Sequence, residues 1–247
     1  DTVDDVYGGF PTAFSTSVYN SGTMTINADS RNGQGSIPGS VGMAYLSNGD
    51  DSGSGAKKRY LVNGINGLMK INGWGNYGIL MNQVDSDSAS FDEKLSNVNR
   101  NILMNKGKVV VNVTNRPSDK TEGNVAIAAF TNNSLTTGND SSFILNNNTG
   151  VVESQTGNNV LLRHFGTGDL FNKGVLLIKS TETIGMDRSN WLFNNTSLNP
   201  GSTSIGINDG VIIADESSQN IKAINGTVNS VMNGGTANTT KKILVSN

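Results

Sequence analysis

The closest-set acidic residues are the first candidates for chemistry, because two carboxyl groups about 5–9.5 Å apart hydrolyse glycosidic bonds. A carboxylate cluster that binds calcium, with a basic residue beside it, would instead suit a polysaccharide lyase. Adjacent residues of a strand point to opposite faces, and no basic set accompanies any pair. We therefore interpret these residues as solvated loop charges. The pairs are Asp4-Asp5, Asp50-Asp51, Asp85 with Asp87, Asp92-Glu93 and Asp215-Glu216.

Residues for nucleophilic catalysis do not form a complete set. His164 is the single histidine, the chain has no cysteine, and no Gly-x-Ser-x-Gly turn occurs. We interpret His164 as a surface or partly buried bystander. The absence of cysteine excludes disulfides and thiolate zinc sites. The sequence thus predicts no catalytic residue, no metal site and no cofactor, and we expect the protein not to be an enzyme.

Aromatic and basic side chains are better candidates for binding. Aromatic rings stack on the apolar faces of sugars, and Trp74 stands between two glycines, where we expect it to be exposed. The run Lys57-Lys58-Arg59-Tyr60 is the one compact basic cluster, and it suits either an anionic partner or a solvated loop edge. Arg59, Tyr60 and Trp74 are therefore the candidate binding residues.

The composition limits the elements that would position these residues. Asn, Gly, Ser and Thr supply 114 of the 247 residues, and only 15% of the residues are charged. A helical bundle needs Ala, Leu, Glu and Lys, so this class is excluded, while recurring Val/Ile/Leu clusters argue against disorder. A net charge of −2 gives no electrostatic footprint for nucleic acid. The composition favours an all-β protein.

A loose repeat supplies the strands of this protein. One or two apolar residues precede Asn-x-Gly, and a β-branched run follows it. Gly and Asn adopt positive φ most readily, so each Asn-x-Gly predicts a corner and the run behind it predicts a strand. Shorter variants occur at Asn66-Gly67 and Asn225-Gly226. The six copies are Asn20-Ser21-Gly22, Asn76-Tyr77-Gly78, Asn105-Lys106-Gly107, Asn148-Thr149-Gly150, Asn172-Lys173-Gly174 and Asn208-Asp209-Gly210.

The uneven spacing of these corners favours a parallel β-helix. A propeller would keep a tighter period, whereas a solenoid tolerates loops of variable length between its strands. At roughly 22 residues per coil, the chain would form about ten coils with asparagine ladders along the axis. An antiparallel sandwich with Asn-Gly hairpins is the alternative. The residues expected to face the interior are Met24, Ile26, Met69, Ile71, Val109, Val111, Val175, Leu177, Val211 and Ile213.

Three stretches break the repeat and are predicted to be insertions in a single domain that spans residues 1–247. They cover residues 28–60, 84–101 and 114–124, which are rich in Gly, Ser and charged residues. Insertions in solenoids gather on one face, which often binds a partner. Tolerated loops without a function are the alternative.

Two runs of the repeat resemble the passenger region of type V autotransporters, in the style of large fusobacterial outer-membrane adhesins. They are Asn172-Lys173-Gly174-Val175-Leu176-Leu177-Ile178 and Asn208-Asp209-Gly210-Val211-Ile212-Ile213. The resemblance covers about residues 18–27 and 61–245. It implies a right-handed β-helix at the cell surface, exported across the bacterial outer membrane, and it transfers no site residues. The chain lacks a signal peptide and a C-terminal membrane barrel, so we interpret it as a fragment whose only membrane contact would be that absent barrel.

The resemblance implies an adhesin segment that attaches bacteria to other bacteria or to host cells through loops on a rigid stalk. Its partner would be a surface glycan or a protein receptor, and not nucleic acid. A carbohydrate-active β-helix enzyme, a secreted toxin-like passenger and a plain spacer are the alternatives.

Overall fold

Three parallel sheets make up the described part of the protein. The computed structural model describes residues 15–29, 40–47, 58–83, 100–121, 123–130, 141–165, 169–188, 206–215, 218, 220–226 and 231–233. Within these residues every strand pairing is parallel, and no residue lies in a helix. Consecutive strands belong to consecutive sheets, so each strand pairs with the third strand before it and the third strand after it. This arrangement rules out the antiparallel sandwich.

The sheets are named A, B and C in the order in which the chain enters them. Sheet A contains β1 (Ser15–Asn20), β4 (Lys58–Asn63), β7 (Arg100–Asn105), β10 (Ser141–Asn146), β13 (Leu170–Asn172), β16 (Gly206–Asn208) and β19 (Val231–Asn233). Sheet B contains β2 (Thr23–Asp29), β5 (Leu68–Trp74), β8 (Lys108–Val113), β11 (Val151–Thr156), β14 (Val175–Ile178) and β17 (Val211–Ala214). Sheet C contains β3 (Val41–Ser47), β6 (Tyr77–Gln83), β9 (Val125–Phe130), β12 (Val160–Phe165), β15 (Ile184–Arg188) and β18 (Lys222–Gly226).

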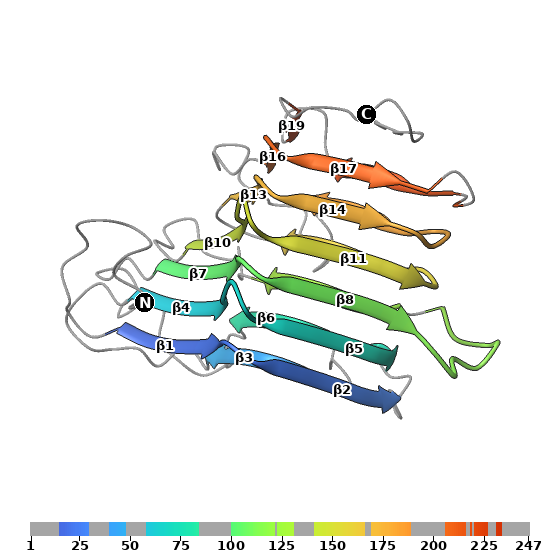
Figure 1. Cartoon of the computed structure of the whole chain (residues 1–247), viewed down its shortest axis with the longest axis horizontal. Helices are drawn as coiled ribbons and strands as arrows, with labels where there is room; N and C mark the ends of the chain where they lie inside the picture. Colours follow the sequence, from blue (N-terminus) through green and yellow to red (C-terminus); the bar gives the residue numbers. More distant parts are fainter. Residues whose placement is uncertain are drawn as a thin grey trace, which may run out of the picture.

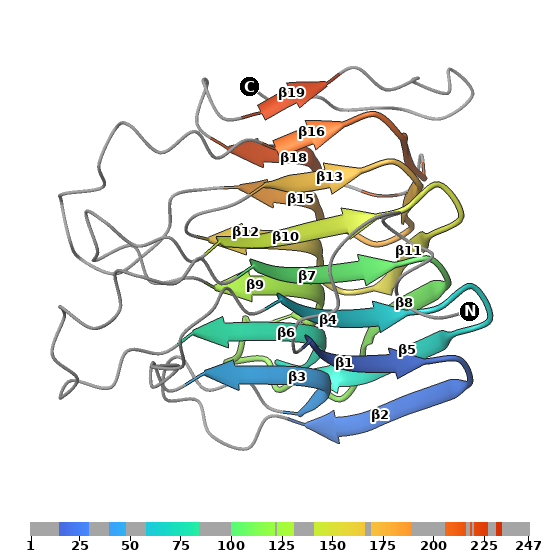
Figure 2. The same ribbon diagram turned by 90° about the vertical axis from the view of Figure 1, so that its left-hand side faces the viewer.

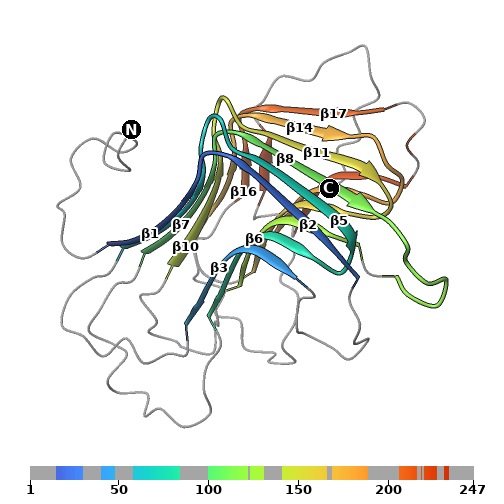
Figure 3. The same ribbon diagram turned by 60° about the horizontal axis from the view of Figure 1, so that its bottom comes forward.

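One strand from each sheet makes one coil of a parallel β-helix, which confirms the predicted fold class. Figure 1 shows sheet B stacked from β2 at the bottom to β17 at the top, and Figure 2 shows sheet A in front of sheet C. From the N-terminal end the chain turns clockwise as it recedes (Figure 3), so the β-helix is right-handed. Connections between parallel strands have this hand almost without exception.

The coils are longer and fewer than expected. Sheet A, the largest, holds seven strands within the described residues, so these residues make six full coils and one further strand. Equivalent asparagines of neighbouring coils lie 43 residues apart between Asn20 and Asn63, but only 26 apart between Asn146 and Asn172. The estimate of about ten coils is therefore wrong for this part of the chain, because the connections lengthen most coils well beyond 22 residues.

Side chains two and four residues after each corner glycine face the interior. Met69, Ile71, Val109 and Val111 obey this rule and are fully buried, as predicted. The first coil follows the same pattern less tightly, with Ile26 buried and Met24 half-buried against the core. In the last two coils of sheet B the predicted phase is wrong by one residue, because the buried side chains are Leu176, Ile178, Ile212 and Ala214, while Val175, Leu177, Val211 and Ile213 are half-exposed on the outer face.

Replacing Leu176 or Leu177 with alanine tests which of these adjacent side chains faces the interior. Leu176→Ala empties part of the interior and is expected to lower the free energy of unfolding by about 2 kcal/mol. Leu177→Ala removes a half-exposed side chain and is expected to cost less than about 1 kcal/mol. Urea unfolding followed by circular dichroism measures both. Equal losses from the two variants would contradict the assigned phase.

The predicted insertions fall at two different corners of the coil. The stretch 28–60 contains β3, a regular strand of sheet C, so it is not a single insertion. Residues 30–39, 48–57 and 84–99 lie outside the described residues. The stretch 114–124 is a loop between β8 and β9, as predicted, and Arg116 Nη1 donates to the carbonyl oxygen of Thr121 across it at 3.3 Å. The described part of the chain contains no helix long and apolar enough to cross a membrane.

Candidate interaction face on sheet B

A ladder of inward-pointing asparagines holds the corner between sheets A and B. In each link, the Nδ2 atom of one asparagine donates to the Oδ1 atom of the asparagine in the next coil, which confirms the predicted ladder. The members from Asn63 to Asn172 are completely buried. The links are Asn20–Asn63 at 2.8 Å, Asn63–Asn105 at 2.9 Å, Asn105–Asn146 at 2.9 Å, Asn146–Asn172 at 2.8 Å and Asn172–Asn208 at 2.7 Å.

At two corners the ladder asparagine is not the one that the motif predicts. The ladder uses Asn146 and not Asn148, and Asn63 and not Asn66, so two corners have the longer form Asn-x-x-x-Gly. Asn76 belongs to a different corner, between sheets B and C. The last two extra residues of each longer corner are exposed, while the ladder asparagine is completely buried.

The second corner, between sheets B and C, has its own row of polar side chains, which was not predicted from the sequence. The backbone N–H of each member donates to the side-chain oxygen of the member in the next coil. Each member stands immediately before a strand of sheet C, and this position is the signal that would have revealed the row. The links are Ser40–Asn76 at 2.9 Å, Asn76–Asn124 at 3.0 Å, Asn124–Asn159 at 3.1 Å and Asn159–Thr183 at 3.3 Å.

Between these two corners lies the outer face of sheet B, which no labelled element covers in Figure 1. Strand register arranges its outward side chains in rows along the helix axis. The first row is Thr23, Leu68, Lys108, Val151, Val175 and Val211. The second row is Thr25, Lys70, Val110, Glu153, Leu177 and Ile213. In these two rows the N-terminal half of the face is mostly polar, with Leu68 and Val110 as its apolar members, and the C-terminal half is largely aliphatic.

A third row of amides and hydroxyls completes the polar half. Asn72 Nδ2 donates to Asn27 Oδ1 at 2.7 Å, and Asn112 Nδ2 donates to Asn72 Oδ1 at 3.4 Å. The Thr156 hydroxyl donates to the side-chain oxygen of Asn112 in the preceding coil. These groups are wholly or partly exposed, so they offer donors and acceptors to a partner at the spacing of the strands, about 4.8 Å.

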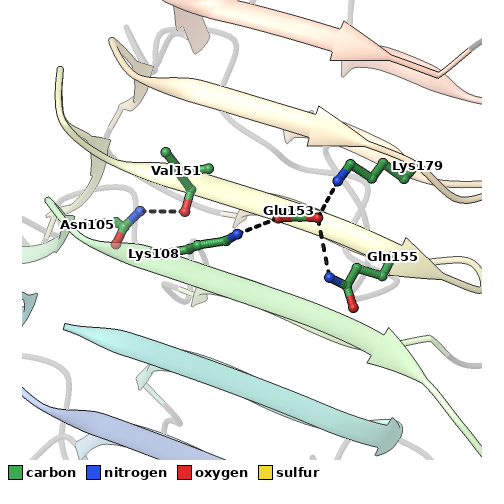
Figure 4. A network of polar contacts seen from close by, with 6 residues as sticks. All are labelled: Asn105, Lys108, Val151, Glu153, Gln155 and Lys179. Atoms are coloured by element: carbon green, nitrogen blue, oxygen red, sulfur yellow. Dashed lines mark hydrogen bonds and ion pairs between the residues drawn. The ribbon is translucent and has the colours of Figure 1, made fainter. Parts of the chain in front are cut away.

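Glu153 is the one acidic side chain in the two long rows of this face (Figure 4). Lys108 Nζ lies 2.7 Å from its Oε2 atom, and Lys179 Nζ lies 2.7 Å from its Oε1 atom. Gln155 Nε2 also donates to Oε1, at 3.3 Å. The Glu153 side chain is only 3% exposed, whereas those of Lys108 and Lys179 are 47% and 49% exposed. The carboxylate therefore fixes two ammonium groups at the surface.

The pKa of Glu153 reflects these contacts. Burial alone would raise the pKa of Glu153. The hydrogen bonds from Lys108, Lys179 and Gln155 lower it by a larger amount, so the pKa is about 2, below its ordinary value of 4.5. Because the folded pKa lies below the unfolded one, the ionised group stabilises the fold above about pH 4.5. That stabilisation is lost as the pH falls from about 4.5 to about 2.

Glu153→Gln is expected to reduce the pH dependence of stability. The wild-type chain should exceed the variant by about 2 kcal/mol in free energy of unfolding at pH 7, and this difference should shrink as the pH falls toward 2. Urea titrations across this pH range measure it. Asp119→Asn is the control for the loss of one carboxylate charge, because Asp119 is exposed beside Lys120 and its replacement should cost less than about 1 kcal/mol at pH 7. A constant difference between Glu153→Gln and wild type at every pH would contradict the linkage.

The structure does not bring the three predicted binding residues together. Tyr60 is 6% exposed on the outer side of sheet A, where it packs with Val62 and Met104. Trp74 ends β5 in sheet B and is 5% exposed, so the expectation that it is exposed is wrong. Of Arg59 only the backbone, in β4, is described. Burial of the two aromatic rings removes the surface that sugar stacking would need.

His164 and the acidic residues form no catalytic group among the described residues. His164 is completely buried on the inner side of β12, in register with Ala129 of β9, so the surface or partly buried position expected for it is wrong. The pair Arg163–Asp187 is nearby in sequence and lies outside on sheet C, with Nε 3.1 Å from Oδ2. Of the predicted acidic pairs only Asp215 is described. No three His, Cys, Asp or Glu side chains of the described segments are placed to hold a metal ion.

Comparison of the chain with protein-family models, with curated proteins and with solved structures gives no match. The fold therefore rests on the strand pairing itself, and the resemblance to autotransporter passengers stays a prediction.

Proposed function

We propose that this chain is an adhesin segment displayed at a bacterial cell surface, which attaches the cell to other bacteria or to host cells. The observation that carries the proposal is the open outer face of sheet B. Its two long rows of side chains keep register over six strands, and a row of hydrogen-bonded polar side chains runs along each edge. A surface held this firmly loses little conformational entropy when a partner binds.

The stack beneath this face supports the role of a stalk. Its coils contact one another through continuous backbone pairing and buried amide links, so force along the axis is distributed over many hydrogen bonds. The loops at 28–60 and 84–101 were predicted to provide the contact surface, and that role stays a prediction because most of these residues lie outside the described part.

Beads coated with the purified chain test the proposal. We expect them to adhere to epithelial cells or to other bacteria more than beads coated with albumin. The chain has no cysteine, so a single introduced thiol directs a polyethylene glycol maleimide to one place. Thr25→Cys, labelled on the outer face of sheet B, should lose adhesion. Ser118→Cys, labelled on the loop between β8 and β9, should keep it.

Two results would contradict the proposal in different ways. If the unlabelled chain adheres to neither class of cell, the adhesin assignment is wrong. If the label at Ser118 blocks adhesion and the label at Thr25 does not, attachment takes place away from the sheet B face. Circular dichroism of each labelled chain confirms that the strands remain folded.

A further inference from the structure

Five lysines gather on the outer face of sheet B and at its corner with sheet A. Lys70 lies on β5, Lys108 lies on β8, and Lys179 directly follows β14. Lys106 and Lys173 occupy the middle positions of two Asn-x-Gly corners that lead into β8 and β14. We call these five residues the lysine stripe.

The lysine stripe is positive within a chain whose net charge is −2. Glu153 lies within it and neutralises one of the two lysines that it contacts. Asp209 occupies the next corner after Lys173. Among the described residues no carboxylate forms an ion pair with Lys70, Lys106 or Lys173, and Lys70 and Lys173 are exposed. The stripe therefore keeps an excess of cationic groups available to a ligand.

These charges follow the helix axis. Lys106 N–H donates to the Asn63 carbonyl and Lys173 N–H donates to the Asn146 carbonyl, with Asn147 in the coil between them. From β5 to β14 the stripe crosses three strand spacings, about 14 Å. A ligand that matches it carries negative charges repeated along a linear chain. Each exposed contact is weak, about 0.2–1 kcal/mol, so affinity would come from several contacts made at once.

The neighbouring side chains identify the kind of polyanion. The amides of Asn72 and Asn112 and the hydroxyl of Thr156 run beside the stripe and suit a ligand rich in hydroxyl groups. Single-stranded nucleic acid would need several exposed aromatic rings on which successive bases stack. On sheet B Trp74 is buried, and the exposed Tyr19 lies on sheet A beside the first corner, away from the lysines of β5, β8 and β14. We propose that the lysine stripe binds a linear anionic polysaccharide that lies along the helix axis. This inference rests on the proposed adhesin function and names its ligand class.

Calorimetric titration of the full chain tests the inference with three defined probes. These are a heparin oligosaccharide, a polygalacturonate oligomer and neutral dextran. We expect at least one anionic probe to bind, dextran not to bind, and added salt to weaken the binding. Lys70→Gln/Lys173→Gln should lower the affinity about tenfold. The matched control Lys120→Gln/Lys222→Gln also removes two lysines, one on the loop after β8 and one on sheet C. It should leave the affinity within about twofold of the wild-type value.

Glu153→Gln separates ligand binding from misfolding. A misfolded variant would lose affinity for the polysaccharide, whereas Glu153→Gln should raise that affinity several-fold because it removes the negative charge inside the lysine stripe. The ligand class is wrong if no anionic probe binds, if dextran binds equally well, or if both double variants lose affinity equally. It is also wrong if a thymidine oligonucleotide or phosphatidylserine vesicles bind more tightly than either polysaccharide through the same lysines.

Adhesion of the same variants separates this inference from the proposed function. If beads carrying wild type and Lys70→Gln/Lys173→Gln adhere to cells equally, the adhesin function stands and the ligand class is wrong. If the stripe binds polysaccharide but the wild-type beads adhere to no cell, the ligand class stands and the adhesin function is wrong.

Discussion

Asn105→Asp is expected to destabilise the protein by about 4 kcal/mol or more at pH 7, although it replaces one atom with another of similar size. Asn105 is completely buried in the middle of the ladder. Its Nδ2 atom donates to Asn146 Oδ1 at 2.9 Å and to the Val151 carbonyl at 3.3 Å. A carboxylate has no proton to donate, so it would place a buried negative charge against two oxygen atoms.

The pH dependence of this variant distinguishes the charge from a packing defect. Protonation of the introduced carboxylate would restore a donor to the ladder, so the loss relative to wild type should narrow at acidic pH. Urea unfolding at pH 7 and at acidic pH measures it. Asn72→Asp makes the same chemical change in the exposed row of sheet B and should cost less than about 1 kcal/mol. A loss at Asn105 that matches the loss at Asn72 would contradict a structural role for the ladder.

The ladder also shows how much of the fold can be predicted from the amino-acid sequence alone. An Asn that recurs before a Gly marks the corner, because a short amide can donate to the next coil and accept from the preceding one along a stack of coils. That pattern correctly predicted the β-helix and the ladder. It did not separate Asn146 from Asn148, because both precede Gly150 and only the pairing with Asn105 and Asn172 distinguishes them.

The Asn-Gly pattern did not reveal which side chains of each strand point inward, or which residues meet on the outer face of sheet B. Alternation between polar and apolar residues reveals the buried side of β8, where Lys108 is exposed and Val109 is buried. Val175-Leu176-Leu177-Ile178 is apolar throughout and contains no such signal. The contact of Lys108 and Lys179 with Glu153 joins residues of three different coils, and uneven connection lengths conceal such register from a single sequence.

Most of the predicted corner glycines lie at corners, but Gly78 lies within β6 and Gly226 is the last residue of β18. The physical reason predicted for the corner glycines was also wrong. Positive φ was the expected requirement, yet among the described glycines it occurs at Gly73, Gly75 and Gly157, near the other corner. The glycines of the ladder corner have ordinary φ values and are instead packed against the backbone of the preceding coil. A Cβ atom on Gly174 would lie 2.2 Å from the Gly150 carbonyl oxygen and 2.3 Å from that of Asn147. The absence of a side chain, and not backbone freedom, is what this corner needs.

Gly174→Ala should therefore lower the free energy of unfolding by at least about 3 kcal/mol, because two backbone oxygens would have to move apart in a tightly stacked corner. Gly22→Ala is the matched control. It occupies the same place in the Asn-x-Gly corner of the first coil, and no atom lies within 4 Å of its added Cβ. Its effect should stay within about 0.5 kcal/mol of zero. If positive φ were the requirement, both substitutions would destabilise equally, so parallel urea titrations of the two variants decide between backbone conformation and close stacking.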